Sequence, residues 1–502
     1  MTAARSMGLK AFALATVAGL ALSGAALGQK PPPAGAARPA LPTAKPPPLG
    51  APMQAQPAPA RPTPPAAQAP APTPPAFTAP QVIPPNEPAA VTRLRGVFGA
   101  DTRLSYASAQ ALDGAGEQVR LAGVVLERPG KRATIEEVTL NGLREDGVAE
   151  AVLRGFATEE AGTTVRIAML RLGGLTVQRD APGVPPQPEQ VRLDSLRIEN
   201  LQASGGTTLR LALVELEGWN AGQPARLAIE GLESSDFGGG MVDGLRIARF
   251  AMSGLDAARM LGAAFRGERV PSLVGRSNLE MLRLELLGGG RPVGGIAEMR
   301  IEADVTATDG SGSGTLALRG IRVEPMPMIA DWLTRFGYQA IDGEITAATT
   351  HDATTGRVEI RDLTIAAREA GTLTFSINLD GLTPERVQAA DFAQARLISA
   401  ALGYADASLF RRFVAMQAAQ TRTPEAQLRE QFAAMAGGAL SQPGAAALDP
   451  IRDAVLSFIR GQAQSVQISV KPPQPIGMEQ MQSVPPSPAE MQRVLGITAT
   501  AR

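Results

Sequence analysis

Apolar and polar residues alternate in short runs along most of the chain after Val91. Residues 191–204, VRLDSLRIENLQAS, illustrate the pattern. The apolar positions are Leu193, Leu196, Ile198 and Leu201, and the charged ones are Arg192, Asp194, Arg197 and Glu199. A spacing of mostly two residues puts apolar side chains on one face of a β-strand and charged side chains on the other. The pattern therefore predicts strands that have one apolar face and one wet face.

Similar runs recur, and each of them meets a glycine or an asparagine followed by a hydrophobic residue. They cover residues 133–145, 164–178, 208–221, 243–257, 279–289 and 298–325, and continue to residue 382. We interpret the glycine and asparagine positions as turns between short strands. The recurrence predicts a long antiparallel meander of short amphipathic strands. The fold class is thus mainly β, followed by a C-terminal α+β region.

The single histidine lies in a segment that reads as a hairpin. His351 and Asp352 stand between two strand-like runs, and Gly356 follows them as a turn residue. A metal site would need further ligands converging on His351, and the chain has no second histidine and no cysteine. We therefore place His351 at a hairpin tip. Residues 308–314, TDGSGSG, predict another hairpin turn.

The C-terminal part mixes helix and strand signals. A capping residue, a proline and an early acid mark helix starts at Thr383-Pro384, Thr423-Pro424, Asp449-Pro450 and Ser487-Pro488. Residues 397–404 and 464–471 predict strands, and either Asp406 or Ser408 is expected to cap the helix that follows the first of them. A helix over residues 327–337 is expected to divide a first sheet from a second.

The N-terminus has the order of a secretory signal. Arg5 and Lys10 precede an apolar run over residues 11–22, and small residues follow up to Gly28. We expect residues 1–28 to direct Sec-type export to the periplasm, with an uncleaved inner-membrane anchor as the alternative. Residues 29–90 are rich in Pro and Ala and predict a disordered tether. The β-rich repeat-like domain then spans residues 91–325, and the α+β domain spans residues 326–502.

Composition excludes several function classes. Lys plus Arg and Asp plus Glu both number 48, so no net charge attracts nucleic acid. Aromatic residues are 4% of the chain, too few for stacking platforms along a single strand. The chain lacks cysteine, which excludes disulfides and thiolate sites. We expect no nucleic-acid partner and no cofactor.

A search for catalytic motifs leaves only scattered acids. Residues 129–134, PGKRAT, lack the first glycine and the hydroxyl of a P-loop, and the glycine-rich stretches read as loops. The remaining candidates are Glu145, Asp146, Glu150, Glu159, Glu160, Glu233 and Asp236. A hydrolase with paired carboxylates, for example a carbohydrate-active one, is the least favoured hypothesis, because sugar platforms of Trp are nearly absent. We assign no catalytic, cofactor-binding or metal-binding residue and expect a protein that is not an enzyme.

Binding is the favoured function class. A sheet with one apolar face must cover that face with helices, with another sheet, with a partner or with an apolar ligand. Two alternatives stay open: a groove that binds a lipid or another apolar ligand, and a self-contained core in a scaffold that binds an envelope protein. Peripheral association with a membrane is compatible with both.

The runs LRIENLQASG and LTFSINLDGLTPE, the export segment and the C-terminal YADASLFRRF with its capped helices resemble AsmA-like and related uncharacterised periplasmic proteins of Gram-negative bacteria. The resemblance covers roughly residues 91–496. It implies a long curved β-sheet and, for some members, a role in lipid transport or outer-membrane upkeep. The Pro-Ala tether departs from that family. No functional residue is carried over from the resemblance.

Overall fold

The alternating runs form the strands of one antiparallel sheet in a computed structural model. The structure describes residues 83–502 except 99–101, 129–130, 161, 179–185, 238–239, 269–272, 384–385, 387–391, 442–445, 478–479 and 482–486. The predicted export segment, nearly all of the tether and the helix start at Thr383-Pro384 lie outside the described residues.

The strands are long, because most runs continue through the positions that we interpreted as turns. Their bounds are β1 Arg103–Ser105, β2 Ser108–Ala111, β3 Gln118–Arg128, β4 Lys131–Leu143, β5 Gly147–Glu160, β6 Thr163–Val177, β7 Val191–Ser204, β8 Thr208–Trp219, β9 Ala225–Ser235, β10 Gly244–Leu255, β11 Gly275–Gly288, β12 Arg291–Val305, β13 Gly312–Val323, β14 Ile341–Asp352, β15 Arg357–Ala367, β16 Gly371–Asp380, β17 Arg396–Asp406, β18 Ser465–Val470, β19 Ile476–Gly477 and β20 Ile497–Ala501.

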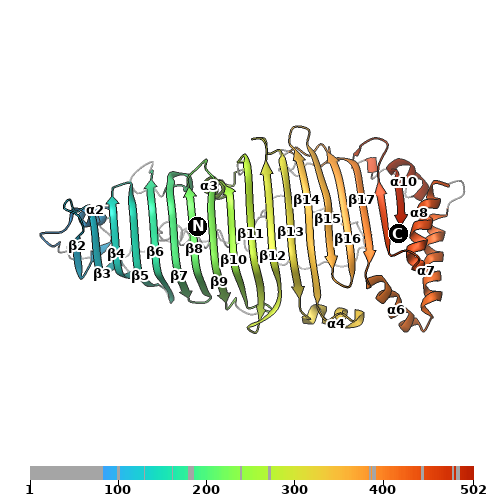
Figure 1. The fold of residues 1–502 in the computed structure, drawn as a ribbon, viewed down its shortest axis with the longest axis horizontal. Coiled ribbons are helices and arrows are strands. Elements are labelled where there is room, and N and C mark those ends of the chain that lie inside the picture. The colour runs from blue at the N-terminus through green and yellow to red at the C-terminus, as the bar shows by residue number, and fades with distance from the viewer. Residues whose placement is uncertain are drawn as a thin grey trace, which may run out of the picture. The chain divides into compact units, whose positions relative to one another are not determined.

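Each strand from β4 to β16 pairs with the strand before it and the strand after it in the sequence (Figure 1). At the N-terminal edge, β1 and β2 both pair with β3. At the other edge, β17 pairs with β18 and β19, and β20 pairs with β18. The mainly β fold class and the antiparallel meander are confirmed.

Left-handed residues inside many strands explain how the strands continue. Odd-numbered strands carry them at one row across the sheet: Gly123, Gly155, Asn200, Gly231, Arg283 and Gly320. Even-numbered strands carry them at a second row: Gly142, Gly174, Gly218 and Gly254. At Gly231 the backbone has φ 62°, and a Cβ there would lie 2.8 Å from the Cβ of Ala212 on β8. Only glycine can adopt this positive φ and also fit so close to Ala212 without strain.

These two rows of left-handed residues keep the apolar side chains on one face. Along β7, burial moves from Ile198 to Leu201, three positions on, across Asn200 with its φ of 51°. Neighbouring strands shift at the same row, so Leu201 still faces Leu211 and Ile198 still faces Val214. A glycine or asparagine followed by a hydrophobic residue therefore marks a shift of phase within a strand, as in a β-bulge. Our interpretation of these positions as turns was wrong.

Short helices interrupt or follow the meander. Their bounds are α2 Ala89–Phe98, α3 Ala257–Arg266, α4 Pro327–Phe336, α6 Leu409–Thr421, α7 Glu425–Leu440, α8 Asp449–Arg460 and α10 Pro488–Leu495, and two 3-10 turns are η2 Pro188–Gln190 and η3 Ala446–Leu448. The helix predicted over residues 327–337 forms as α4. It does not divide two sheets, because β13 pairs directly with β14, for example at Leu318 and Ile345. The sheet continues across the predicted boundary between residues 325 and 326.

The predicted helix starts are correct to within one residue where the structure describes them. Ser487 is the N-cap of α10 and Pro488 its first residue. In α7 Pro424 is itself the N-cap, and α8 begins at Asp449. Of the two predicted caps of α6, Ser408 occupies the N-cap position, whereas Asp406 supplies the accepting side chain: its Oδ1 accepts the N–H of Phe410 at 2.7 Å.

His351 lies at the end of β14, in a hairpin with β15, where it faces Val358. Asp352 Oδ1 accepts the N–H groups of Thr354 and Thr355 at 3.0 and 3.2 Å, and Gly356 has φ 69°. The hairpin tip is confirmed. Asp352 shapes the turn through bonds to the backbone, and these bonds lower the pKa of its carboxyl.

Candidate functional site

An uninterrupted row of apolar side chains crosses the sheet from β2 to β20. Each member faces the next directly across a strand pair, so all of them share one face. The row consists of Ala109, Leu121, Val138, Leu153, Leu170, Ile198, Val214, Ile229, Phe250, Met281, Met299, Leu318, Ile345, Ile365, Leu373, Tyr404, Val466 and Ala501. We call this the central apolar row, and the surface on which it lies the apolar face.

Further apolar rows lie beside it on the same face. One of them consists of Val119, Leu140, Ala151, Leu172, Leu196, Leu216, Leu227, Met252, Leu279, Ile301, Leu316 and Ala347. Toward the C-terminus another consists of Leu363, Phe375, Leu402, Ile468 and Ala499. The apolar face is therefore several side chains wide, and no charged side chain interrupts these rows.

Helix α2 covers the N-terminal end of the apolar face. Its Ala90 and Val91 are buried in one cluster with Leu121 and Val138 of the central apolar row. A polar contact holds this end of the helix: Glu87 accepts hydrogen bonds from Arg95 at 2.7 Å and from the Tyr106 hydroxyl at 2.8 Å. The tether is predicted to reach residue 90, but Glu87 already belongs to the ordered structure. We did not identify Glu87 as a structural residue from the sequence.

Helix α8 covers the opposite end. It packs on β20 and β18, where Ile451 and Ala454 are buried together with Ala499. The ring of Phe458 meets the edge of Tyr404, the central-row residue of β17, with 5.8 Å between ring centroids. Burial, together with a 2.8 Å hydrogen bond to Asp406, raises the pKa of the Tyr404 hydroxyl above its ordinary value.

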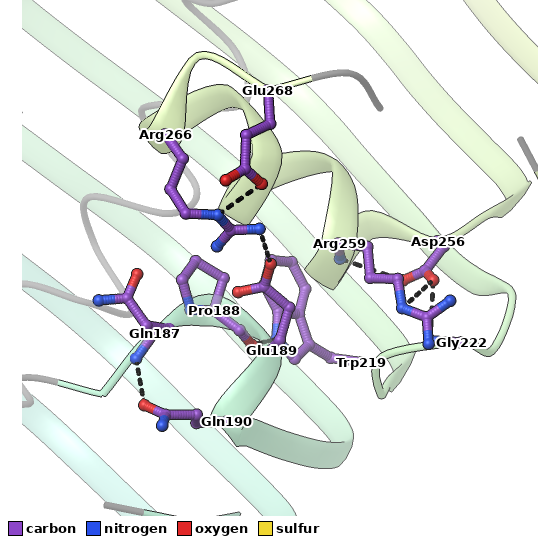
Figure 2. Close-up of polar contacts among 10 residues, drawn as sticks. All are labelled: Gln187, Pro188, Glu189, Gln190, Trp219, Gly222, Asp256, Arg259, Arg266 and Glu268. Carbon is purple, nitrogen blue, oxygen red and sulfur yellow. Dashed lines mark hydrogen bonds and ion pairs between the residues drawn. The ribbon is translucent and has the colours of Figure 1, made fainter. Parts of the chain in front are cut away.

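A third cover lies at one side of the apolar face, where η2 meets α3 (Figure 2). The buried Trp219 of β8 donates its Nε1–H to the Pro188 carbonyl at 3.2 Å. Glu189 accepts a 2.7 Å hydrogen bond from Arg266 of α3, which lowers the pKa of the carboxyl. A Cβ at Gly262 would lie 1.9 Å from Glu189 Oε1, so the carboxylate packs directly on the helix backbone.

Between these covers the apolar face opens toward the C-terminal strands. Leu121, Ile198, Val214 and Ile229 of the central apolar row are buried. In contrast, four large apolar side chains on β15 to β18 are exposed: Ile365 by 43%, Leu373 by 38%, Leu402 by 46% and Ile468 by 37%. Ile365 faces Leu373, and Leu402 faces Ile468. We call these four residues the open section.

The other face of the sheet is polar and carries Arg and Glu in cross-strand ion pairs. Arg300 of β12, for example, lies 3.0 Å from Glu280 of β11 and 3.1 Å from Glu298. A hollow of about 560 Å³ on this face is lined by charges of both signs, among them Glu150, Arg171, Asp194 and Arg197. Exposed pairs of this kind contribute little stability each, because water and salt screen the attraction between the charges. Their charged side chains keep this face hydrated, whereas the opposite face is apolar.

Four of the seven acids singled out in the sequence have polar side-chain partners. Glu150 pairs with Arg171 at 2.6 Å, Glu160 with Lys131 at 2.6 Å, and Glu233 with Arg246 at 3.3 Å, while Asp236 accepts a hydrogen bond from Thr208 at 3.2 Å. Glu145 and Asp146 lie between β4 and β5, and Glu159 lies near the end of β5. Within the described residues, no group of three or more His, Asp or Glu side chains has the geometry to hold a metal ion.

Comparison with known proteins adds one finding. A family model described as an uncharacterized protein matches residues 364–502, which contain all four residues of the open section and helices α6 to α10. No curated protein matches the chain. In the part of the chain that the structure describes, no helix is long and apolar enough to cross a membrane.

Proposed function

We propose that the protein binds the acyl chains of a lipid along its apolar face and acts in the periplasm of a Gram-negative envelope without catalysing a reaction. The observation that carries the proposal is the central apolar row together with its open section. The predicted export segment supports the compartment. The resemblance to AsmA-like proteins supports the same class of function.

The chemistry of the apolar face favours hydrocarbon over other ligands. A sugar or a peptide needs hydrogen bonds to orient it, and these rows offer almost none. An acyl chain needs only apolar area, and each methylene removed from water contributes about 0.8 kcal/mol. At about 4.8 Å from strand to strand, the row from β2 to β20 follows a path on the order of 80 Å along the sheet. Several acyl chains fit along such a path.

The test is lipid extraction and native mass spectrometry of the full chain, expressed in a Gram-negative host and purified from the periplasmic fraction. We expect acyl lipid at stoichiometric level. Replacing Leu373→Asp and Leu402→Asp puts charge on the open section and should reduce the bound lipid at least tenfold, because a buried carboxylate needs a partner. Thr374→Asp, an exposed position one residue from Leu373 on the opposite face, is the control.

Three outcomes contradict the proposal. A lipid-free monomer would show that the sheet covers its own apolar face. A stoichiometric bound protein would identify the scaffold alternative. Recovery from the cytoplasmic fraction alone would remove the periplasmic assignment.

A further inference from the structure

Helix α4 presents an aromatic surface beside the open section. Leu333 faces inward with 1% exposure, whereas Trp332 is 43% exposed. The Trp332 ring lies 4.9 Å from the Phe336 ring and 6.1 Å from the Tyr338 ring, between centroids. These three aromatic residues form a cluster at the connection between β13 and β14.

The start of α6 contacts both α4 and the turn before β16, at the same ends of the strands (Figure 1). Arg412 of α6 lies over the Tyr338 ring at 4.3 Å and donates to the carbonyls of Phe336 and Gly337 at 2.7 Å. The N–H of Leu409 donates to the Ala370 carbonyl at 2.9 Å. The three segments therefore make one continuous surface.

This surface carries exposed arginines that form no ion pair within the described part of the chain. Arg335 on α4, Arg368 in the turn and Arg411 on α6 are exposed, and none forms an ion pair with a residue that the structure describes. The acids nearby are Asp331, which is exposed, Glu369, 3.9 Å from Arg412, and Asp342, 3.5 Å from Arg322. Asp406 is engaged by the backbone of α6. On the polar face of the sheet, in contrast, many arginines pair with Glu across strands, for example Arg171, Arg246 and Arg249.

We propose that α4, the turn at residues 368–370 and the start of α6 dock on a membrane surface that contains anionic lipid. Exposed Trp takes up the interface between acyl chains and headgroups, and Arg residues free of acidic partners bind phosphate. Three arginines without acidic partners among the described residues, close to an exposed Trp, give this surface a positive charge that complements anionic headgroups. The docking does not depend on whether the apolar face carries lipid, although it would bring the open section close to a membrane.

The chain offers a local probe, because it contains only two tryptophans. Trp332 is exposed, whereas Trp219 is buried with 2% exposure. With the full chain, we would measure tryptophan emission and its quenching by brominated acyl chains in vesicles of phosphatidylcholine, with and without phosphatidylglycerol. We expect a blue shift and quenching with anionic vesicles, weaker with neutral ones and reduced by salt. The Trp332→Phe variant, which leaves Trp219, should lose both signals.

Replacing Arg335, Arg368 and Arg411 together by Gln should weaken partitioning to anionic vesicles on the order of tenfold or more. The matched control replaces Arg226, Arg246 and Arg249, which pair with acids on β8 and β9, by Gln with the same change of net charge. Its binding should stay within about twofold of the unmodified chain.

Two results would overturn the docking proposal. Binding to vesicles without quenching of Trp332 would place the contact elsewhere, for example at residues 11–22. If both triple variants lost the same amount of binding to anionic vesicles, the effect would come from net charge alone. Acyl lipid on the purified protein is measured without vesicles, so the two proposals fail independently.

Discussion

At the scale of single residues, the left-handed positions decide how the apolar face is built. They alternate between two rows, one on the odd strands and one on the even strands. Most are glycine, but Asn200 and Arg283 take the same conformation with φ 51° and 50°. A non-glycine residue in this region carries a cost of about 1–2 kcal/mol, which the packing of the neighbouring strands must offset.

Gly231→Ala tests this arrangement. The added Cβ requires the strained backbone and approaches Ala212, so we expect a loss of about 1–3 kcal/mol in the free energy of unfolding. Urea unfolding followed by circular dichroism measures it. Gly206→Ala is the control, since nothing lies within 4 Å of the new Cβ and the backbone there needs no positive φ. Equal midpoints for the two variants would show that the row tolerates side chains.

At the scale of elements, short helices and turns determine which part of the apolar face is covered. A buried polar contact between Glu87 and Arg95 helps to hold helix α2 in position. The side chain of Glu87 is 2% exposed and that of Arg95 12%, and Arg95 also donates to the Leu104 carbonyl at 2.6 Å. Burial opposes ionisation of Glu87, but the hydrogen bonds from Arg95 and Tyr106 outweigh it, so its pKa lies below the ordinary value.

This shift makes the docking of α2 sensitive to acid. A lowered carboxyl pKa adds stability above the ordinary value of 4.5, and that stability is lost as the pH falls through the folded-state pKa. We expect the unfolding midpoint to decline below about pH 4.5. Glu87→Gln should be less stable at neutral pH and decline less in acid. Urea unfolding between about pH 6 and about pH 3 measures both, and parallel curves would contradict the assignment.

Part of this architecture is visible in the sequence. Two-residue alternation predicts the strands, the meander and the wet face, because a half-buried strand needs that period. It does not distinguish a strand that ends from a strand that shifts phase, since both give a three-residue step such as Ile198 to Leu201. From the sequence, helix α4 is expected to separate two sheets, because the direct pairing of β13 with β14 leaves no signal in the sequence of the helix.

The apolar face as a candidate site is also visible in the sequence, but its open section is not. Leu373 and Leu402 have the same pattern as buried residues on earlier strands. Their exposure depends on where α8 packs, and α8 lies far along the chain. The docking surface required the structure as well, because Trp332, Arg368 and Arg411 come from three separate segments.

At the scale of the whole molecule, the sheet from β3 to β10 repeats every two strands, because the rows of left-handed residues alternate there. Residues 208–243 contain β8, β9 and the connection that follows them. Without them, β7 would pair with β10 in the register that it now has with β8. Leu196 would then face Met252, Ile198 would face Phe250, and Leu201 would face Ile247.

A chain that lacks residues 208–243 should therefore keep its β-sheet and unfold cooperatively. We expect a modestly lower thermal midpoint, because the contact of Trp219 with η2 is lost. The control lacks residues 208–224, a single strand with its turn. It would place Gly231 opposite Ile198, and we expect it to aggregate. Circular dichroism and thermal unfolding measure the difference, and equal behaviour of both deletions would contradict the two-strand repeat.

The pairing of each strand with its neighbours in sequence also sets the order in which the molecule can assemble. Nearly every contact in the sheet is local, and even the ion pair of Arg266 with Glu189 spans only 77 residues. Closing each loop therefore costs little chain entropy, and local contacts favour rapid folding. A chain that emerges from its N-terminus can add one strand after another to a growing edge before its C-terminus is available.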